Sequence, residues 1–496
     1  TGTASTAVLK DVERELEITD YDAIITPETF DRKELKYKVV RMPSGEKQRE
    51  LVETINTVIP DFFGRTSNQF YRMREDDTNC GIIFCPHVNG EYGVVRVKNY
   101  LDETLTKSDF YAGGKPKGVV KDTDWERHKR EVAQDFKSNK INTLVATKAF
   151  GMGIDKPNVR FTVHYGIPSS LESFYQEAGR AGRDGNESLC VLLLSNDNKK
   201  DDEKILNPIL PLEEVYSIVE KQRRDEGDDI SRVMFFHMQA FKGIDFELRQ
   251  IEAVVDRLYS AAAIFTELPI IIKCGQDDED NSLRNVQKAL QRLLVLGVVA
   301  DYTVDYAANE ICVIPGSAKA SDIRTKYSKY IKGYNEGRIA KELTKLESVS
   351  TADEKRYVIN AAKVLTEFVY DTIEKGRRRG LREMVNAAEA ALASKTPDAT
   401  LRQRIVRYFE STYIDELTDV VESPQLGFEL IPGIIDGVYD ELSGSIVGGI
   451  RSSNEASGLR GGVSRYLEST PDHPGLLMLR ALAELYCNDC DVTSLG

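Results

Sequence analysis

The sequence has few of the features that mark secreted or membrane proteins. Its 7 cysteines among 496 residues show no paired framework, which fits a reducing compartment and excludes a disulfide-stabilised secreted domain. No apolar run approaches the roughly 20 residues of a membrane span, and no secretory leader is visible. With 5 histidines in all, a hydrolytic triad is a poor hypothesis. We therefore expect a cytoplasmic protein with no membrane partner.

Positive charge is scarce as well. The chain has 66 lysine and arginine residues against 80 aspartate and glutamate residues, a formal net charge of −14. This balance argues against nucleic-acid binding through overall charge. Any such binding would have to rest on local basic strips.

Two kinds of site are missing from the sequence. No Gly-x-x-x-x-Gly-Lys-Ser/Thr phosphate loop occurs anywhere in it. A structural zinc needs four ligands, and the sequence offers one isolated Cys-x-x-Cys pair, with His473 and Cys312 as distant candidates; the pair is Cys487 and Cys490. No cysteine lies between Cys190 and Cys274. We expect no metal site.

The informative chemistry is concentrated in Val145–Gly185, where a strand, a glycine-broken turn and a second strand precede an expected helix. Ser169 has the spacing of a capping box with the glutamate three residues later, so it would cap this helix. Gln176, Arg180 and Arg183 then follow at i, i+4 and i+7 and would share one helix face. Two glycines lie in the same stretch, Gly179 and Gly182. Glycines at such positions indicate close backbone approach, and two arginines on one face suggest a polyphosphate clamp.

These residues resemble two motifs of the RecQ family of superfamily 2 DNA helicases. Ala146–Asp155 is similar to motif V, and Tyr175–Gly185 is similar to motif VI. The resemblance covers roughly Thr1–Ser195, and its weaker parts are the following: Thr1–Ser5 resembles motif III, Gly81–Cys85 resembles motif IV, and Phe30-Asp31-Arg32 matches a further family segment. The family's acidic metal-binding segment, which should precede motif III, is not found. We therefore expect the C-terminal portion of a larger helicase, from its second RecA-like motor lobe onward.

The resemblance implies roles for individual residues. Arg183 is the best candidate for an arginine finger, with Arg180 beside it and Gln176 orienting that arginine or the nucleotide. Gly153 and Asp155 would serve the nucleotide site and couple it to DNA, while Thr147 and Lys148 would contact a DNA phosphate. ATP and Mg²⁺ are the implied cofactors of the intact protein, with most of their ligands on the missing lobe. DNA, single-stranded and at a duplex junction, is the implied partner.

The pattern of elements predicts an α/β protein with several domains. Residues 36–195 alternate strands and helices, which indicates a parallel sheet covered on both faces. We assign residues 1–200 to a second RecA-like lobe, 201–265 to a helical linker region, 266–316 to a winged-helix-like domain and 317–496 to a helical C-terminal domain of unknown role. Within these, we expect a linker at Asn196–Glu203, helix breaks near Gly376 and Gly380, and a Gly/Ser-rich loop at Gly444–Gly462.

The expected winged helix consists of the amphipathic helix Asn281–Leu296, Gly297, and a hairpin of Val298–Val304 with Glu310–Ile314. A generic helix-hairpin unit is the alternative. Three basic residues at i, i+4 and i+8 of the helix would track duplex phosphates, or else form a solvated face: Arg284, Lys288 and Arg292. The most basic cluster, Arg377–Arg379, would be a DNA strip or an interdomain contact, but a solvated charge run is favoured.

Two functions of different classes remain. The first is the C-terminal part of a RecQ-like ATP-dependent DNA helicase, which couples ATP hydrolysis to strand separation in DNA repair or recombination. The second is a helicase-derived interaction module, whose helical C-terminal region holds a protein partner in a multi-protein DNA-repair or phage-defence complex. The intact motif VI favours the motor, whereas the acidic charge and the unassigned C-terminal region favour the module.

This chain by itself is expected not to hydrolyse ATP. Without a phosphate loop and metal-binding carboxylates, the Mg²⁺-nucleotide is not held for attack. The measurement is phosphate release by the purified chain with and without single-stranded DNA. DNA-stimulated turnover above a mock-purified control would contradict the expectation.

Overall fold

A computed structural model describes residues 30–117, 124–150, 155–224, 227–260, 268–275, 281–332, 338–409, 414–440, 445–447, 449–450 and 453–486. Three expectations lie outside these residues, namely the motif III resemblance, Gly153 in motif V and the Cys487/Cys490 pair. The described chain forms two compact units. Unit 1 contains residues 30–237 and 377–411, and unit 2 contains residues 238–376 and 412–486.

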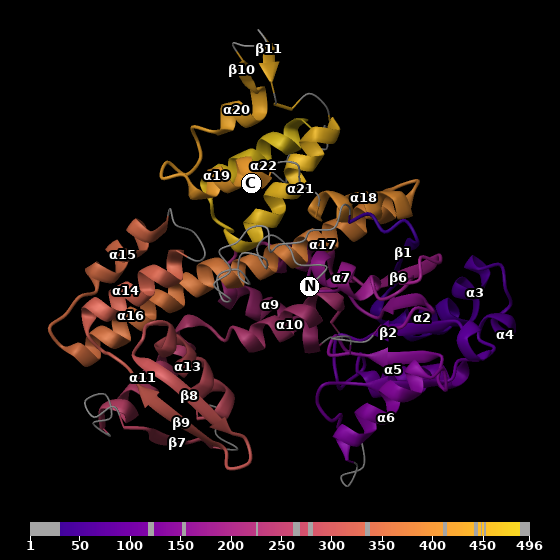
Figure 1. The fold of residues 1–496 in the computed structure, drawn as a ribbon, viewed down its shortest axis with the longest axis horizontal. Helices are drawn as coiled ribbons and strands as arrows, with labels where there is room; N and C mark the ends of the chain where they lie inside the picture. Colours follow the sequence, from indigo (N-terminus) through magenta and orange to yellow (C-terminus); the bar gives the residue numbers. More distant parts are fainter. Residues whose placement is uncertain are drawn as a thin grey trace. The chain divides into compact units, whose positions relative to one another are not determined.

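Unit 1 is built on a six-stranded sheet in the order β1-β6-β5-β2-β4-β3 (Figure 1). Its strands are β1 Leu35–Arg41, β2 Cys80–Phe84, β3 Ser108–Tyr111, β4 Thr143–Ala146, β5 Val159–His164 and β6 Ser188–Leu194. Every neighbouring pair is parallel. The expected parallel sheet is therefore confirmed, with β3 as a strand that the sequence analysis did not identify.

Helices cover both faces of this sheet. Their bounds are α2 Lys47–Glu53, α3 Ile59–Phe62, α4 Ser67–Phe70, α5 Val94–Tyr100, α6 Trp125–Lys137 and α7 Leu171–Ala178. On one face, Leu51 of α2, Phe70 of α4 and Val97 of α5 are fully buried in a core with Phe161 of β5. On the other face, the ring of Phe174 from α7 lies 4.7 Å from that of His164. This two-faced burial is what the unbroken apolar strands predict.

The remaining helices of unit 1 come from two distant parts of the chain. They are α8 Lys199–Ile205, α9 Leu212–Arg224, the start of α10 Asp229–Ala240, most of α17 Lys375–Ala393, and α18 Pro397–Phe409. The expected linker at Asn196–Glu203 is wrong from Lys199 onward, because α8 begins there. Ile205 is fully buried, and the Asp202 side chain is only 3% exposed. Tertiary burial has ordered a segment whose polar composition alone indicated a loop.

A buried ion pair lies at the carboxyl end of β6. The Lys47 Nζ donates to Asp229 Oδ2 over 2.5 Å, and both side chains are 1% exposed. The Ser195 backbone N–H donates to the same carboxylate over 2.9 Å. Burial lowers the pKa of Lys47 and raises the pKa of Asp229, while their mutual contact opposes both shifts. The pair ties α2 and α10 to the end of a central strand.

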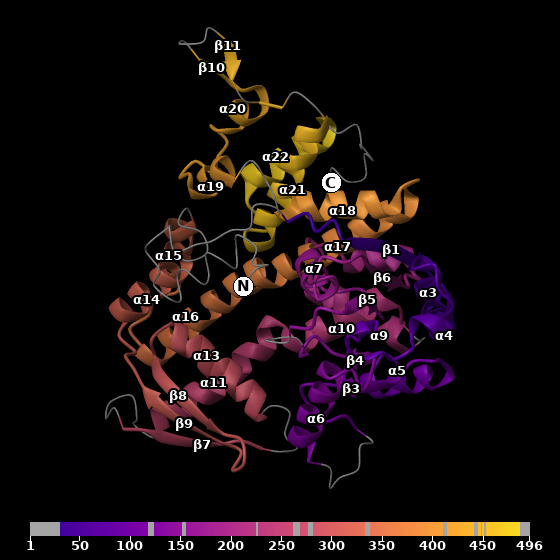
Figure 2. The same cartoon turned by 45° about the vertical axis from the view of Figure 1, so that its right-hand side comes forward.

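Unit 2 contains a three-stranded antiparallel sheet in the order β7-β9-β8, with helices beside it (Figure 2). Its elements are α11 Ile244–Ser260, β7 Ile270–Lys273, α13 Leu283–Val295, β8 Val299–Asp305 and β9 Glu310–Pro315. Ser282 caps α13 by accepting from the Asn285 N–H. The helix, the left-handed Gly297 and the hairpin lie where the sequence predicts them. A winged helix and a generic helix-hairpin unit share this outline.

The rest of unit 2 is mainly helical. The elements are α14 Ala320–Lys332, α15 Ile339–Ser348, α16 Glu354–Val369, α19 Ile414–Glu422, α20 Ile431–Asp436, the hairpin β10 Val438–Asp440 and β11 Ser445–Val447, α21 Ser453–Ser469 and α22 Pro474–Tyr486. No described helix is both long enough and apolar enough to span a membrane.

Two expectations about glycine-containing segments are wrong. The chain is not broken at Gly376 or Gly380; a π-helical turn, Tyr370–Glu374, instead joins α16 to α17. A Cβ at Gly376 would lie 1.8 Å from the Glu468 carbonyl oxygen, so glycine permits a close backbone contact there. The expected loop at Gly444–Gly462 is helical from Ser453, because α21 buries an apolar stripe. That stripe is Ala456, Leu459 and Val463.

We expect Asp229→Asn to lower the free energy of unfolding by about 3–5 kcal/mol, because it leaves the Lys47 ammonium buried without a counter-charge. The double variant Lys47→Met/Asp229→Asn should cost less than the two single variants added together. Urea denaturation followed by the fluorescence of Trp125, the 1 tryptophan of the chain, reports on this unit.

The exposed ion pair of Arg49 with Glu46 provides the control. Arg49→Ala should change the free energy of unfolding by less than about 0.5 kcal/mol. Strict additivity of the two single changes at Lys47 and Asp229 would show that this pair does not couple.

Candidate functional site

Helix α7 carries the first part of the motif VI resemblance. Ser170 begins it, accepting a hydrogen bond from the Ser173 N–H over 3.1 Å, so the expected cap at Ser169 is displaced by one residue. His164 of β5 lies under the helix, with its Nδ1 3.0 Å from Glu177 Oε2. Gln176 is on the exposed side of the helix. The sheet and the cap thus fix α7 from below and at its start.

The helix ends earlier than the sequence predicts. Residues 179–187, which we name the arginine loop, connect α7 to β6. Gly182 adopts φ +64°, a left-handed conformation that favours glycine, and a Cβ there would lie 2.9 Å from Glu34 Cγ. The expectation that Gln176, Arg180 and Arg183 share one helix face is therefore wrong, because both arginines belong to the loop.

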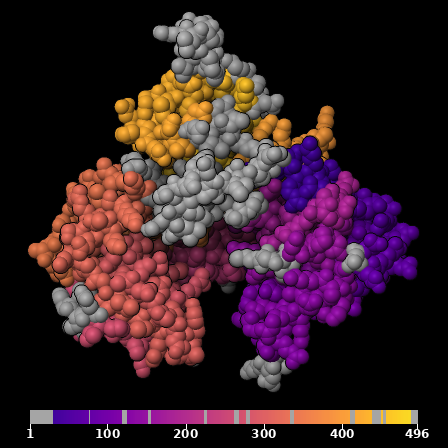
Figure 3. Space-filling view, viewed as in Figure 1, coloured from indigo at the N-terminus to yellow at the C-terminus, as the bar shows by residue number. Residues whose placement is uncertain are grey.

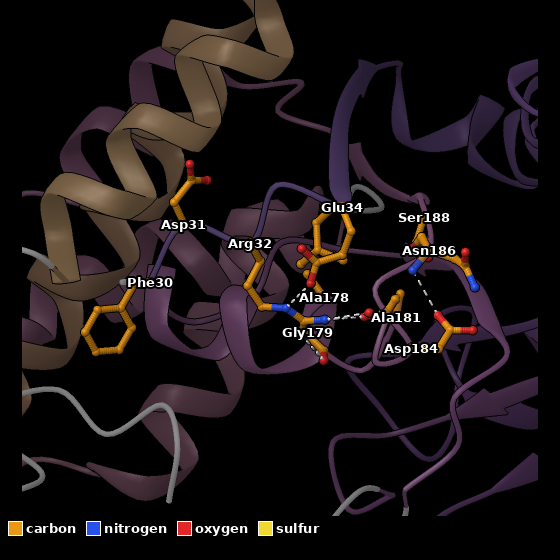
Figure 4. A network of polar contacts seen from close by, with 12 residues as sticks. Phe30, Asp31, Arg32, Glu34, Ala178, Gly179, Ala181, Asp184, Asn186 and Ser188 are labelled. Atoms are coloured by element: carbon orange, nitrogen blue, oxygen red, sulfur yellow. Dashed lines mark hydrogen bonds and ion pairs between the residues drawn. The ribbon is translucent and has the colours of Figure 1, made fainter. Parts of the chain in front are cut away.

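The Arg32 side chain holds the arginine loop. Its guanidinium donates to the carbonyl oxygens of Gly179 over 2.6 Å, Ala181 over 3.0 Å and Gly182 over 3.1 Å. The Arg32 Nε also donates to Glu34 Oε1 over 2.5 Å. Figure 4 shows this side chain pointing toward Gly179 and Ala181. Arg32 lies in the segment Phe30-Asp31-Arg32 that resembles the family, but nothing in the sequence indicates this contact with the loop.

The far end of the arginine loop is held by a second guanidinium. Arg160 of β5 makes a two-pronged contact with Asp184, with Nη1 3.0 Å from Oδ1. The Asn186 N–H donates to the same Asp184 oxygen over 3.1 Å. Burial raises the pKa of Asp184, but the contacts with Arg160 and Asn186 outweigh it and leave that pKa at about 2. Both ends of the loop are therefore fixed by charged hydrogen bonds, which are stronger than neutral ones.

The two candidate arginines differ in their surroundings. The Arg183 Nη1 lies 3.0 Å from Asp155 Oδ1, and the two side chains are 34% and 81% exposed. Arg180 is half-buried, and its burial and the nearby Arg183 charge lower its pKa. An arginine remains charged even so. The structure thus places Arg183 beside both Asp155 and Arg180.

The expected DNA contacts of motif V lie at another edge of the sheet. Thr147 follows β4 at its carboxyl end, is 7% exposed, and donates its N–H to the Tyr111 carbonyl over 3.2 Å. Lys148 beside it is exposed. In contrast, the Gly182 N–H donates to the Val159 carbonyl at the amino end of β5, so the arginine loop lies at the opposite ends of these parallel strands.

The three basic residues expected to form a strip on α13 differ in their surroundings. Arg284 is exposed. Lys288 donates to the Ala240 carbonyl over 2.6 Å at the end of α10, and Arg292 pairs with the buried Glu247 over 2.9 Å. The expectation that all three side chains turn outward is wrong for Lys288 and Arg292, because each donates to an acceptor on a neighbouring helix.

The arginine cluster of α17 also differs from the favoured interpretation. Arg378 is 2% exposed and donates to the carbonyls of Asn207 and Leu210 over 2.9 Å each, and to that of Pro208 over 3.2 Å. A solvated charge run is therefore wrong for Arg378. Its guanidinium instead satisfies the carbonyls between α8 and α9.

We expect Arg32→Ala to lower the free energy of unfolding of unit 1 by about 1.5–3 kcal/mol, the range for a hydrogen-bonded charged group. Asp155→Ala should cost less than about 1 kcal/mol, because its pair with Arg183 is exposed. Urea denaturation followed by Trp125 fluorescence measures both, with the exposed neighbour Lys33→Ala as the matched control. An Arg32 variant as stable as the Lys33 variant would contradict the assigned contacts.

Part of this chain is similar in sequence to known proteins. Residues 66–185 match the helicase conserved C-terminal domain. The putative ATP-dependent DNA helicase Q1 of Caenorhabditis elegans is 38% identical over 194 residues, which are 39% of this chain and 26% of that protein. The ATP-dependent DNA helicase RecQ of Bacillus subtilis is 32% identical over 195 residues, which are 39% of this chain and 27% of that protein.

The likeness to solved structures is slighter. Mss116p DEAD-box helicase domain 2 bound to an RNA duplex is 21% identical and covers 36% of this chain and 58% of that chain, with a TM-score of 0.25, on which no argument rests. The match spans only about a quarter of the two curated relatives, 26% and 27% of their lengths. Within those bounds, the motifs, the parallel sheet and the relatives agree: the matched part of this chain is similar to the C-terminal helicase portion of RecQ-like superfamily 2 proteins.

Proposed function

We propose that this chain is the C-terminal motor portion of an ATP-dependent DNA helicase that couples ATP hydrolysis to DNA strand separation. The observation that supports this most strongly is the arginine loop. Arg32 and Arg160 hold its two ends, and Arg183 between them is partly exposed beside Arg180. A rigid backbone that presents two guanidiniums suits a polyphosphate, whose charge they would stabilise during phosphoryl transfer.

The charges around the loop fit ATP better than they fit a metal ion. Arg183 has the exposed Asp155 as a counter-charge, and the pKa of Arg180 is lowered, so an added anion would stabilise both arginines. Among the described residues, no group of three or more His, Cys, Asp or Glu side chains would hold a metal ion. In the proposal, a first motor lobe would supply the Mg²⁺ site and the phosphate loop.

In this proposal each residue of the loop has one task. Arg183 leaves Asp155 and contacts the phosphoryl group that is transferred, and Arg180 adds charge beside it. Gln176, on the exposed side of α7, orients the nucleotide or Arg180. The pair of Asp155 with Arg183 then marks the nucleotide-free state, and its exchange for phosphate links motif V to motif VI.

DNA contacts would lie elsewhere on the chain. Thr147 and Lys148 at the carboxyl end of β4 suit a strand phosphate, because ligands bind at that edge of open parallel sheets. Arg284 is the remaining exposed residue of the three proposed on α13. The helix and hairpin of unit 2 would add a duplex contact if they act as a winged helix.

An interaction module remains the second candidate. Lys288, Arg292 and Arg378 are engaged with protein groups, which reduces the basic surface on a chain of net charge −14. On this account the helical part of unit 2 would hold a protein partner in a DNA-repair or phage-defence complex.

Arg183→Ala in the natural protein, with its first motor lobe present, should reduce ATP turnover by about 10³-fold or more, the scale of an arginine finger. DNA binding should be largely retained, because it rests on other residues. Phosphate release and DNA affinity are measured on the same preparation, with Arg127→Ala, an exposed arginine of α6, as the control. Turnover within a fewfold of the Arg127 variant would remove Arg183 from the active site and favour the interaction module.

A further inference from the structure

We propose that Arg402, on helix α18 outside the matched helicase domain, is a positioning residue for the arginine loop, so that α18 is a working part of the motor lobe. This inference rests on the proposed function for its consequence in catalysis. Its structural part stands on contacts within unit 1 alone, which contains α18, β1 and α7.

Arg402 donates hydrogen bonds to the backbone of the segment that carries Arg32. Its Nη1 donates to the Arg32 carbonyl oxygen over 2.9 Å and to Asp31 Oδ1 over 2.9 Å. Its Nη2 donates to the Leu35 carbonyl oxygen. The Arg402 side chain is 18% exposed, so these contacts are partly shielded from water. One guanidinium therefore fixes the backbone from which a second guanidinium reaches the loop.

The two arginines act on opposite sides of the same segment. Figure 4 shows the Arg32 side chain directed at the loop carbonyls, while Asp31 and Phe30 point away from them. The Phe30 ring stacks on Phe409 of α18, with centroids 5.0 Å apart. Tyr175 of α7 donates its hydroxyl to the Phe30 carbonyl over 2.8 Å, and its ring lies 4.9 Å from that of Phe409. The segment from Phe30 is thus clamped between α18 and α7.

Helix α18 also covers the edge of the sheet. The Tyr37 N–H on edge strand β1 donates to Asp398 Oδ1 over 2.7 Å, and the Arg402 guanidinium lies 5.5 Å from the Tyr37 ring. Figure 3 shows orange atoms of this region beside indigo atoms near the start of the described chain. Edge strands are commonly protected in this way, so edge protection alone would explain the Asp398 contact. It does not explain why Arg402 reaches past the strand to Asp31 and the Arg32 carbonyl.

Arg402 holds the backbone of Arg32, and the Arg32 side chain holds the arginine loop, so a change at Arg402 reaches the candidate site. Without Arg402, the carbonyl oxygens of Arg32 and Leu35 each lose a hydrogen bond, and Asp31 loses its ion pair. The Arg32 side chain can then shift relative to the loop. Catalytic groups must be held within about 0.5 Å of the productive position. A displacement of about 1 Å can cost about 100-fold in rate. Loss of Arg402 should therefore act through the loop rather than through ATP affinity.

The first test uses this chain alone and needs no activity. Hydrogen-exchange mass spectrometry compares peptides covering residues 179–188 in the wild type, Arg402→Gln, and Gln403→Ala, an exposed neighbour on α18 that serves as the control. We expect the loop amides to exchange about tenfold faster in Arg402→Gln and at the wild-type rate in Gln403→Ala. Unchanged loop exchange in Arg402→Gln would overturn the proposal.

The second test uses the natural protein with its first motor lobe. Arg402→Gln should lower kcat by about 10-fold to 100-fold while the KM for ATP stays within about twofold of wild type. Arg402→Lys keeps the charge but not the planar fork, so it should rescue the rate only in part. If Arg402→Gln does not fold, the exchange and kcat of Arg402→Lys decide the question by the same criteria.

The two proposals fail in different ways. If Arg183→Ala abolishes turnover but the Arg402 variants change neither loop exchange nor kcat, the positioning role is wrong and the motor stands. If the Arg402 variants loosen the loop while Arg183→Ala leaves turnover intact, the contacts of Arg402 stand and the proposed function is wrong.

Discussion

The contact of one guanidinium with three carbonyl oxygens determines the form of the candidate site. The carbonyl oxygens of Gly179, Ala181 and Gly182, which follow the end of α7, converge on Arg32, and the left-handed turn at Gly182 helps them do so. Arg180 lies between two of these carbonyls and is half-buried, while Arg183 follows them and is partly exposed. Arg180 and Arg183 are therefore presented by a loop with a defined backbone rather than by the helix that their spacing suggests.

The same use of positive charge recurs throughout the chain. Lys47 neutralises a carboxylate inside unit 1, Arg378 satisfies the carbonyls between α8 and α9, and Arg292 pairs with a buried glutamate in unit 2. Buried charges need partners, because desolvation otherwise costs several kcal/mol. In this chain, whose net charge is −14, several basic side chains are therefore paired inside the protein rather than exposed on its surface. For this reason basic spacing on a helix, as at Lys288, was a poor guide to DNA contacts here.

The alternation of apolar strands and amphipathic helices was sufficient to predict the parallel sheet of unit 1. The helix Trp125–Lys137 followed by the buried strand Thr143–Ala146 is one unit of this alternation. Predictions failed where local composition was polar or glycine-rich, as at α8 and α21, because burial of a few apolar side chains outweighed local propensity. The helix across Gly179 failed for the opposite reason: the spacing was compatible with a helix, but distant Arg32 stabilised a loop.

The sequence by itself determined the family resemblance and the parallel lobe, and it marked Arg180 and Arg183 as candidates, because motifs and strand periodicity are local properties. It also placed the helix and hairpin of unit 2. Only the tertiary structure decided which cations are available to a ligand and which are internal, since that depends on partners far along the chain. It alone brought Arg402 of α18 to the backbone of Arg32, because contacts between segments so distant in sequence leave no periodic trace.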